Sequence, residues 1–359
     1  MSEFTNTREN RTSVRWQLLA TVSAFALLGA IYGVDKACAE DGDRPLVWLE
    51  LDGQYLQQEN GVDAFAPPFL SASPFDGISH LNVEKGSQNE WDKGARLSFE
   101  PAGSDWVLAL GVQYGKSSRS DVREGHPTTA HLTKYSGKHY TAYQNLSSQS
   151  SQSHFILDFQ AGKDVGLGMF GNGGNSVVSL GVRYTQFDEH GHVGIKSQPT
   201  NLPSSYPFHK FYASFAAKRK FTGIGPSLSW DASAKLIGNS SAGNITFDWG
   251  LNGAVLFGRQ RTQIHRQTTN VYHYLSGGFA GRQKFTYQYS TSPGRNKETT
   301  VPNLGGFAGV SWRYPNAKVS IGYRADMFFG AIDGGIDVAH RESRGFYGPF
   351  ANVSVGVGG

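Results

Sequence analysis

The stretch Val319–Phe329 reads VSIGYRADMFF and alternates between apolar and polar side chains. One face of this stretch carries the apolar members, which are Val319, Ile321, Tyr323, Ala325, Met327 and Phe329. The other face carries Ser320, Gly322, Arg324 and Asp326. A period of two predicts a β-strand with one face in an apolar medium and the other in a polar one. The stretch is also long enough to cross a bilayer as a tilted strand.

Nine further stretches show the same alternation, so we predict ten strands. They are Val47–Gln57, Lys93–Pro101, Trp106–Lys116, His154–Lys163, Ser176–Phe187, Phe211–Trp230, Ile245–Phe257, Leu304–Tyr314 and Phe346–Val357. Twelve strands are the alternative if His273–Ser290 adds a hairpin to the sheet. No turn separates that region from the preceding strand, which favours ten.

The gaps between these strands alternate between long and short. The long gaps are Gln58–Asp92, Ser117–Ser153, Asp188–Lys210, Gly258–Asn303 and Gly330–Gly345. The short gaps are Ala102–Asp105, Asp164–Asn175, Asp231–Asn244 and Pro315–Lys318. Large outer loops and tight periplasmic turns are typical of outer-membrane barrels. Because backbone groups cannot stay unpaired in hydrocarbon, the strands must close into an all-β, antiparallel transmembrane barrel.

The N-terminus has the pattern of a secretory signal. Its basic residues are Arg8, Arg11 and Arg15, ahead of an apolar stretch that ends at Val34. Ala37 and Ala39 precede Glu40 in the small-x-small pattern of a cleavage site. We therefore predict a signal peptide at 1–39, a mature barrel at 40–359 and an outer-membrane location. A retained signal-anchor helix is the alternative reading of the apolar stretch.

Composition excludes several other classes of protein. After Val34 the chain has no run of 18 apolar residues, which excludes a helical membrane protein. Cys38 is the single cysteine, so cleavage leaves no disulfide and no cysteine-based site. A net charge of +4 is too small to argue for nucleic-acid binding. Aromatic residues at 13% and 45 glycines suit strands joined by polar turns.

Strand alternation places a group of charged side chains inside the barrel. We predict that they line a pore: Asp52, Asp158, Arg183, Asp248, Arg313, Arg324 and Asp326. Opposed charges across a lumen create a transverse field that filters ions. Such a field would serve a narrow porin-like channel for small hydrophilic solutes. The alternative is that the charges pair and fill the lumen, which leaves a non-conducting structural or adhesion barrel acting through its loops.

Four motifs in the C-terminal part resemble a known family. They are FTGIGP at Phe221–Pro226, GGFAG at Gly305–Gly309, IGYRAD at Ile321–Asp326 and GFYGPF at Gly345–Phe350, with a weaker likeness in LGVRY at Leu180–Tyr184. Together they resemble the Legionella-type major-outer-membrane-protein family of pore-forming barrels. This resemblance implies an outer-membrane pore or porin-like structural protein with no cofactor. The chain ends in VGVGG and not in the aromatic residue that the barrel-assembly machinery usually reads, so Tyr347 and Phe350 are the candidates for that recognition.

The longest predicted loop, Gly258–Asn303, is strongly basic. Between Arg259 and Thr300 its only acidic residue is Glu298, and tyrosines lie among its cations. We predict contacts with lipopolysaccharide phosphates through Arg261, Arg266, Arg282 and Lys284. The alternative is a solvated hairpin whose aromatic side chains pack across strands.

Three other patterns suggest chemistry but have simpler explanations. GLGMFG at Gly166–Gly171 precedes a predicted strand, whereas a dinucleotide site needs a helix there, so we expect a turn. His190 and His192 have a spacing that would suit metal ligands on one strand face, but they lie in a predicted loop. Nothing in the sequence fixes a catalytic geometry for Asp188, Glu189, His190 and Asp333. We therefore expect no metal site and no enzyme.

Overall fold

The computed structural model describes residues 47–59, 62–65, 81–84, 88–101, 105–123, 127–131, 139–165, 175–199, 208–239, 243–274, 283–335 and 338–357. The strands of the barrel wall are β1 (Val47–Glu59), β4 (Gln88–Phe99), β5 (Trp106–Arg123), β7 (His139–Asp164), β8 (Ser176–Pro199), β9 (Phe208–Asn239), β10 (Gly243–Tyr274), β12 (Gly294–Tyr314), β13 (Ala317–Asp333) and β14 (Arg341–Val357). The short strands are β2 (Val62–Phe65), β3 (Leu81–Glu84), β6 (Pro127–His131) and β11 (Gln283–Thr291).

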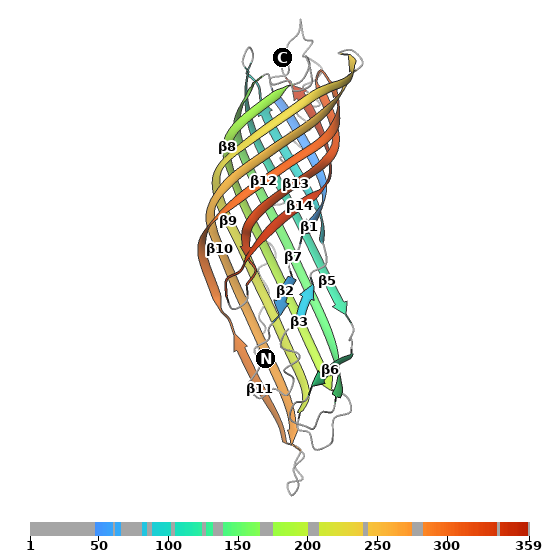
Figure 1. Cartoon of the computed structure of the whole chain (residues 1–359), viewed down its shortest axis with the longest axis vertical. Helices are drawn as coiled ribbons and strands as arrows, with labels where there is room; N and C mark the ends of the chain where they lie inside the picture. Colours follow the sequence, from blue (N-terminus) through green and yellow to red (C-terminus); the bar gives the residue numbers. More distant parts are fainter. Residues whose placement is uncertain are drawn as a thin grey trace, which may run out of the picture.

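Ten strands form a closed antiparallel wall, as predicted (Figure 1). Each wall strand pairs with the next wall strand along the chain, from β1 through β4 to β14. The ring closes between its first and last strands, where Val47 pairs with Val357 and Glu59 pairs with Gly345. Every predicted strand corresponds to one strand of this wall.

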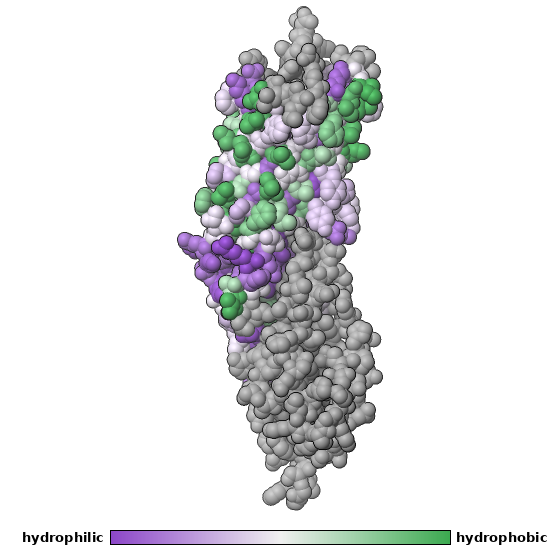
Figure 2. All heavy atoms as spheres, viewed as in Figure 1, coloured by the Kyte–Doolittle hydropathy of each residue, from purple (hydrophilic) through white to green (hydrophobic). Residues whose placement is uncertain are grey.

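The wall has an apolar outside and a polar inside. Along β13, Ile321 and Tyr323 remain 65% and 52% exposed, whereas Ser320 on the opposite face of the strand is buried. Along β10, Leu251 is 55% exposed while Asp248 is buried. Hydrophobic residues gather on the half of the molecule that holds the short turns, and hydrophilic residues lie below them (Figure 2). This inverted arrangement is what lipid contact requires, so the chain is a β-barrel of the outer-membrane type.

The wall continues well past this apolar band. β9 and β10 each contain 32 residues, and they stay paired from Gly243–Asn239 at one end to Tyr272–Phe208 at the other. Three predicted long loops, Ser117–Ser153, Asp188–Lys210 and Gly258–Asn303, therefore consist largely of strand. The prediction ended strands where the apolar alternation ended. Backbone pairing does not depend on hydropathy, so the strands extend into the aqueous region with polar outer faces.

The outer end of the wall is taller on one side. β5, β7, β8, β9 and β10 reach far beyond the level at which β13 ends at Asp333 and β1 ends at Glu59 (Figure 1). β11 pairs with β10, and β6 pairs with β7, in this tall part. β11 pairs with β10 in the same register as β12, from Gln263–Gly294 to Arg266–Thr291, so it continues β12 and adds no further strand to the ring.

The predicted signal peptide at 1–39, with Ala37 and Ala39, lies outside the described residues. Among the residues described, no helix is long and apolar enough to span a membrane.

Candidate functional site

All seven charged residues predicted to line the lumen have inward-facing positions. Asp158 on β7 and Arg183 on β8 are direct cross-strand neighbours and form a two-pronged ion pair, with Nε–Oδ1 and Nη2–Oδ2 distances of 2.7 and 3.0 Å. Arg183 also donates to Asn252 on β10, at 2.9 Å, and to Asn303 on β12. One guanidinium therefore connects four strands through the interior.

The other five charged residues are paired as well. Asp248 accepts from Arg313 at 3.0 Å and lies 3.2 Å from the Lys318 ammonium. Ser311 and Thr246 donate to the same carboxylate. Arg324 is 3.6 Å from Asp326 and 4.0 Å from Asp52. Because these charges neutralise one another, the lumen does not carry a ring of like charges, which is the arrangement that selects ions through its electric field alone.

Two glycines leave space for these inward carboxylates. A Cβ built on Gly305 would lie 1.9 Å from Oδ1 of Asp326, and one built on Gly94 would lie 1.7 Å from Oδ1 of Asp52. Any larger residue at either position would displace the charged side chain opposite it.

A polar vestibule occupies the half of the lumen nearer the short turns. It consists of three neighbouring cavities of about 460, 220 and 110 Å³ that share Glu50 and Arg96 in their linings. The largest is at the mouth, beside Pro315. The smallest is deepest and reaches Asp158, Arg183 and the apolar side chain of Ile156. The vestibule is thus lined by the predicted charges and ends at an apolar layer.

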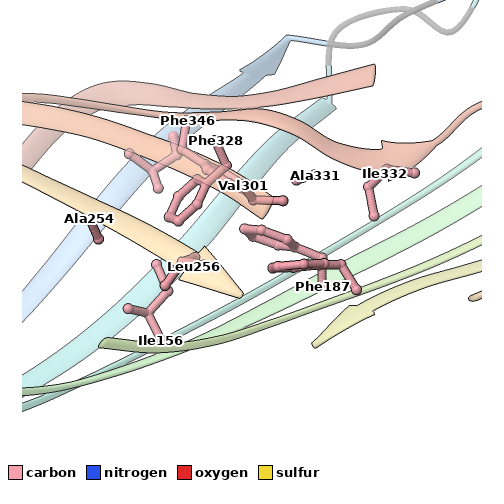
Figure 3. Close-up of a cluster of buried hydrophobic side chains, with 11 residues drawn as sticks. Ile156, Phe187, Ala254, Leu256, Val301, Phe328, Ala331, Ile332 and Phe346 are labelled. Carbon is pink, nitrogen blue, oxygen red and sulfur yellow. The ribbon is translucent and has the colours of Figure 1, made fainter. Parts of the chain in front are cut away.

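This apolar layer is a buried cluster inside the barrel, contributed by eight of the ten wall strands, all except β4 and β5 (Figure 3). We call it the lumen cluster, and its members are Leu56, Ile156, Phe187, Phe221, Ala254, Leu256, Val301, Phe328, Ala331, Ile332 and Phe346. Phe221, Leu256, Val301 and Phe328 have no exposed surface at all. The lumen at this level is filled by packed side chains.

Side chains from opposite walls meet in the lumen cluster. β8 and β14 are five strands apart in either direction round the ring, yet the rings of Phe187 and Phe346 have centroids 5.8 Å apart. Phe328 of β13 contacts Phe187 edge-on at 4.9 Å, and Phe221 of β9 stacks at 6.1 Å. Offset and edge-on contacts at these distances are favourable aromatic geometries.

Buried charges lie on the outer side of the cluster. Glu189 on β8 pairs with Arg219 on β9 at 3.3 Å and with Arg344 on β14, on the opposite wall. These three side chains are at most 3% exposed. A desolvated carboxylate between two guanidiniums thus adds a second connection across the lumen.

A buried histidine forms a further polar group at this level. His154 on β7 has Glu90 3.4 Å from Nδ1 and Asp92 3.1 Å from Nε2. Its ring lies against Phe346, with centroids 4.4 Å apart. A carboxylate at each ring nitrogen favours the doubly protonated imidazolium, because a neutral ring can donate from one nitrogen only.

The chain after Phe329 turns into the lumen and joins the outer side of the lumen cluster. The register between β13 and β14 shifts after Phe328, and Gly330 has a φ of +65°. Gln260 donates to the carbonyl of Gly330 at 2.7 Å, and Arg219 donates to that of Gly334 at 3.0 Å. We call residues 330–335 the inward segment. The predicted loop Gly330–Gly345 therefore contributes Ala331 and Ile332 to the closure of the lumen.

Asp333 fixes the outer end of the inward segment, beyond Phe329, the last apolar residue on the outer face of β13. Its carboxylate accepts from Arg295 at 2.8 Å and from the amides of His340 and Gly335 at 2.9 and 3.1 Å. Burial alone would raise the pKa of Asp333, but these hydrogen bonds outweigh it and hold the pKa below its ordinary value.

Of the four residues predicted to contact lipopolysaccharide, Arg261 and Arg266 are fully described, and both lie on β10. Arg261 is exposed on the outer face of β10, whereas Arg266 has the opposite parity, is half-buried and donates to Thr291. The side chains of Arg282 and Lys284 lie outside the described residues. Successive side chains of a β-strand point to opposite faces, so Arg261 and Arg266, five positions apart on one strand, lie on opposite faces of the wall.

The other candidate residues are also separated by the wall. Glu189 faces inward, while His190 and His192 are exposed on the outer face of β8. No group of three or more His, Cys, Asp or Glu side chains in the described part of the chain is arranged to hold a metal ion.

Comparison with known proteins identifies no family for this chain. No family model and no curated protein matches the chain. Among solved structures, the transport unit of the autotransporter AIDA-I from Escherichia coli is 8% identical, with a TM-score of 0.31 and coverage of 91% of this chain and 96% of that one. The translocator domain of NalP from Neisseria meningitidis is 10% identical, with a TM-score of 0.24 and coverage of 94% and 95%. A bacterial polysaccharide outer-membrane secretin is 10% identical, with a TM-score of 0.21 and coverage of 88% and 100%.

Proposed function

We propose that this chain is a closed outer-membrane barrel whose membrane-spanning part is an anchor and whose tall outer wall makes contacts outside the cell. The observation that carries this proposal is the contact between Phe187 and Phe346 from opposite walls. A ten-stranded barrel has little more interior space than an eight-stranded one, which side chains just fill. The lumen cluster and the Glu189 ion pairs use that space.

Electrical recording tests the closed state directly. The purified, refolded full-length barrel is inserted into planar bilayers, and current is measured in symmetric potassium chloride. We expect no unitary current steps from wild type, because a packed apolar layer excludes water and hydrated ions. Stable open-channel currents from wild type would overturn the proposal.

A narrow channel for small hydrophilic solutes is the second candidate, and the polar vestibule favours it. The vestibule reaches from the periplasmic mouth to the lumen cluster, so displacement of the cluster and the inward segment would connect it to the outside. Replacing Arg295 and Asp333 with alanine removes side-chain contacts that hold this segment. Currents that appear in this variant, with none in an Arg259→Ala control on the outer face, would favour a gated channel over a permanent anchor.

A further inference from the structure

The outer face of β8, β9 and β10 changes from apolar to cationic within one row of side chains. Cross-strand pairing places Tyr184, Ile224 and Phe257 in one row on this face. The next row outward contains Thr222 and Arg259. Residues two apart on a strand are about 7 Å apart, so the first cation lies about one headgroup layer beyond the last apolar row.

The following rows add more positive charge. Lys220 on β9 pairs directly with Arg261 on β10, and Lys218 lies one row further out on β9. We call Lys218, Lys220, Arg259 and Arg261 the cationic face. All four are exposed. Adjacent strands are about 4.8 Å apart, which brings the four charges within reach of one ligand.

Acidic neighbours neutralise only part of this charge. Lys220 is 3.4 Å from Asp188, and Arg259 is 3.5 Å from Glu298. The Arg259–Glu298 pair is exposed and the Lys220–Asp188 pair is partly exposed, and surface pairs of this kind open readily to exchange one anion for another. Within the described residues, neither Lys218 nor Arg261 has an acidic side chain in ion-pair distance. The same level of β7 carries Ser151 and Ser153, so the charge is concentrated on β9 and β10.

We propose that the cationic face binds the phosphate groups of lipopolysaccharide in the outer leaflet. The apolar row of Tyr184, Ile224 and Phe257 then contacts the acyl chains of the same molecule. Arginine suits a phosphate because its planar fork donates two parallel hydrogen bonds, and lysine adds a mobile point charge. The depth of the face along the wall is what selects this ligand, since phosphates at the headgroup level lie beside the first polar row.

The site also revises the prediction from sequence, because only Arg261 of the four residues predicted there belongs to it. The cationic face lies on the outside of the wall. Its occupancy is therefore independent of whether the lumen conducts, and the two proposals can fail separately.

Binding of defined lipids tests the proposal. The full-length barrel in detergent is mixed with bis-phosphorylated lipid A or with dephosphorylated lipid A, and bound lipid is counted by native mass spectrometry. We expect wild type to prefer the phosphorylated lipid by roughly tenfold, which corresponds to one charge-assisted hydrogen bond. That preference should shrink as salt is raised, because the charges are exposed. Equal binding of the two lipids by wild type would overturn the proposal without any variant.

Variants locate the site on the wall. Lys218→Gln with Arg261→Gln removes two charges from the cationic face. Lys163→Gln with Lys235→Gln removes two charges from exposed lysines at the other end of the wall. We expect the first variant to lose the preference for phosphorylated lipid and the second to keep it. Equal loss in both variants, or inorganic phosphate binding as tightly as lipid A, would overturn the assignment to lipopolysaccharide.

Discussion

Phe187 and Phe346 belong to diametrically opposite strands of the barrel, and their rings stack across its interior at a centroid distance of 5.8 Å. Two strands that never share a backbone hydrogen bond are thus joined by side chains. The same pair of strands is joined again by Glu189 and Arg344. These two strands are therefore joined by two transverse connections, one apolar and one ionic.

Truncating the aromatic connection should open a path for ions. Phe187→Ala combined with Phe346→Ala removes two phenyl rings from the layer that blocks the vestibule, so water can enter from the polar side. We expect unitary currents in planar bilayers from the double variant. Phe257→Ala is the control, because this ring is 57% exposed on the outer face of β10. Silence from a folded double variant would show that the outer charges and the inward segment close the lumen by themselves.

Breaking the ionic connection should lower the stability of the outer half of the barrel. Glu189→Gln leaves Arg219 and Arg344 buried without the carboxylate between them, at a cost of roughly 3–5 kcal/mol. Urea unfolding in lipid vesicles, followed by tryptophan fluorescence, measures the loss. Glu298→Gln makes the same chemical change in an exposed pair, where the side chain is 85% exposed, and should cost less than about 1 kcal/mol. Equal costs for the two variants would contradict a desolvated pair.

A charge on the outer face should be tolerated only outside the apolar band. Leu251→Lys places an ammonium in lipid and should cost roughly 2–4 kcal/mol if Leu251 lies near the midplane. Gln263→Lys puts the same side chain on the same face of β10, level with Lys218 at the outer edge of the cationic face, and should cost little. Heat-modifiable mobility in electrophoresis reports whether each variant folds. A folding yield for Leu251→Lys equal to that of Gln263→Lys would contradict the placement of the band.

The anchor of the inward segment should depend on pH in one direction. The folded pKa of Asp333 lies below its ordinary value of 3.8. The carboxylate therefore contributes stability above that ordinary value, and the contribution disappears as pH falls through the lowered folded value. Asp333→Asn should unfold at a lower temperature than wild type at pH 7. The difference should shrink as pH falls below 3.8, and a difference that stays constant would exclude the ionised carboxylate as its cause.

Much of the fold could be predicted because lipid imposes a strict alternation. Stretches such as Val319–Phe329 expose their apolar face to hydrocarbon, so one period determines both strand and face. The same rule placed Asp158 and Arg183 inside the barrel. The rule could not predict that Arg183 bonds to Asn252 and Asn303, because these residues lie on other strands and meet Arg183 only once the barrel has closed.

The lumen cluster could not be predicted from the sequence, for a physical reason. Alternation predicts that Phe187 and Phe346 face inward. Nothing in the neighbouring sequence shows whether such an aromatic residue packs in a core or whether the two faces of the strand were assigned the wrong way round. Met327-Phe328-Phe329 interrupts the alternation, and that interruption marks the point where Phe328 enters the core. The long strands were missed because polar strands outside the membrane lose the apolar signal and keep only the backbone pairing.

The pairing of β1 with β14 also has a consequence for how the chain is made. Val47 and Val357 are partners in the wall and lie almost as far apart in sequence as the barrel strands allow. The first strand cannot acquire its second neighbour until the last strand has been exported. Through that whole interval the growing sheet has two open edges, each able to join another chain. Closure is therefore a late and slow event, because contacts between the most distant parts of a chain form slowly. Protection of the unfinished sheet is a requirement built into the order of the strands.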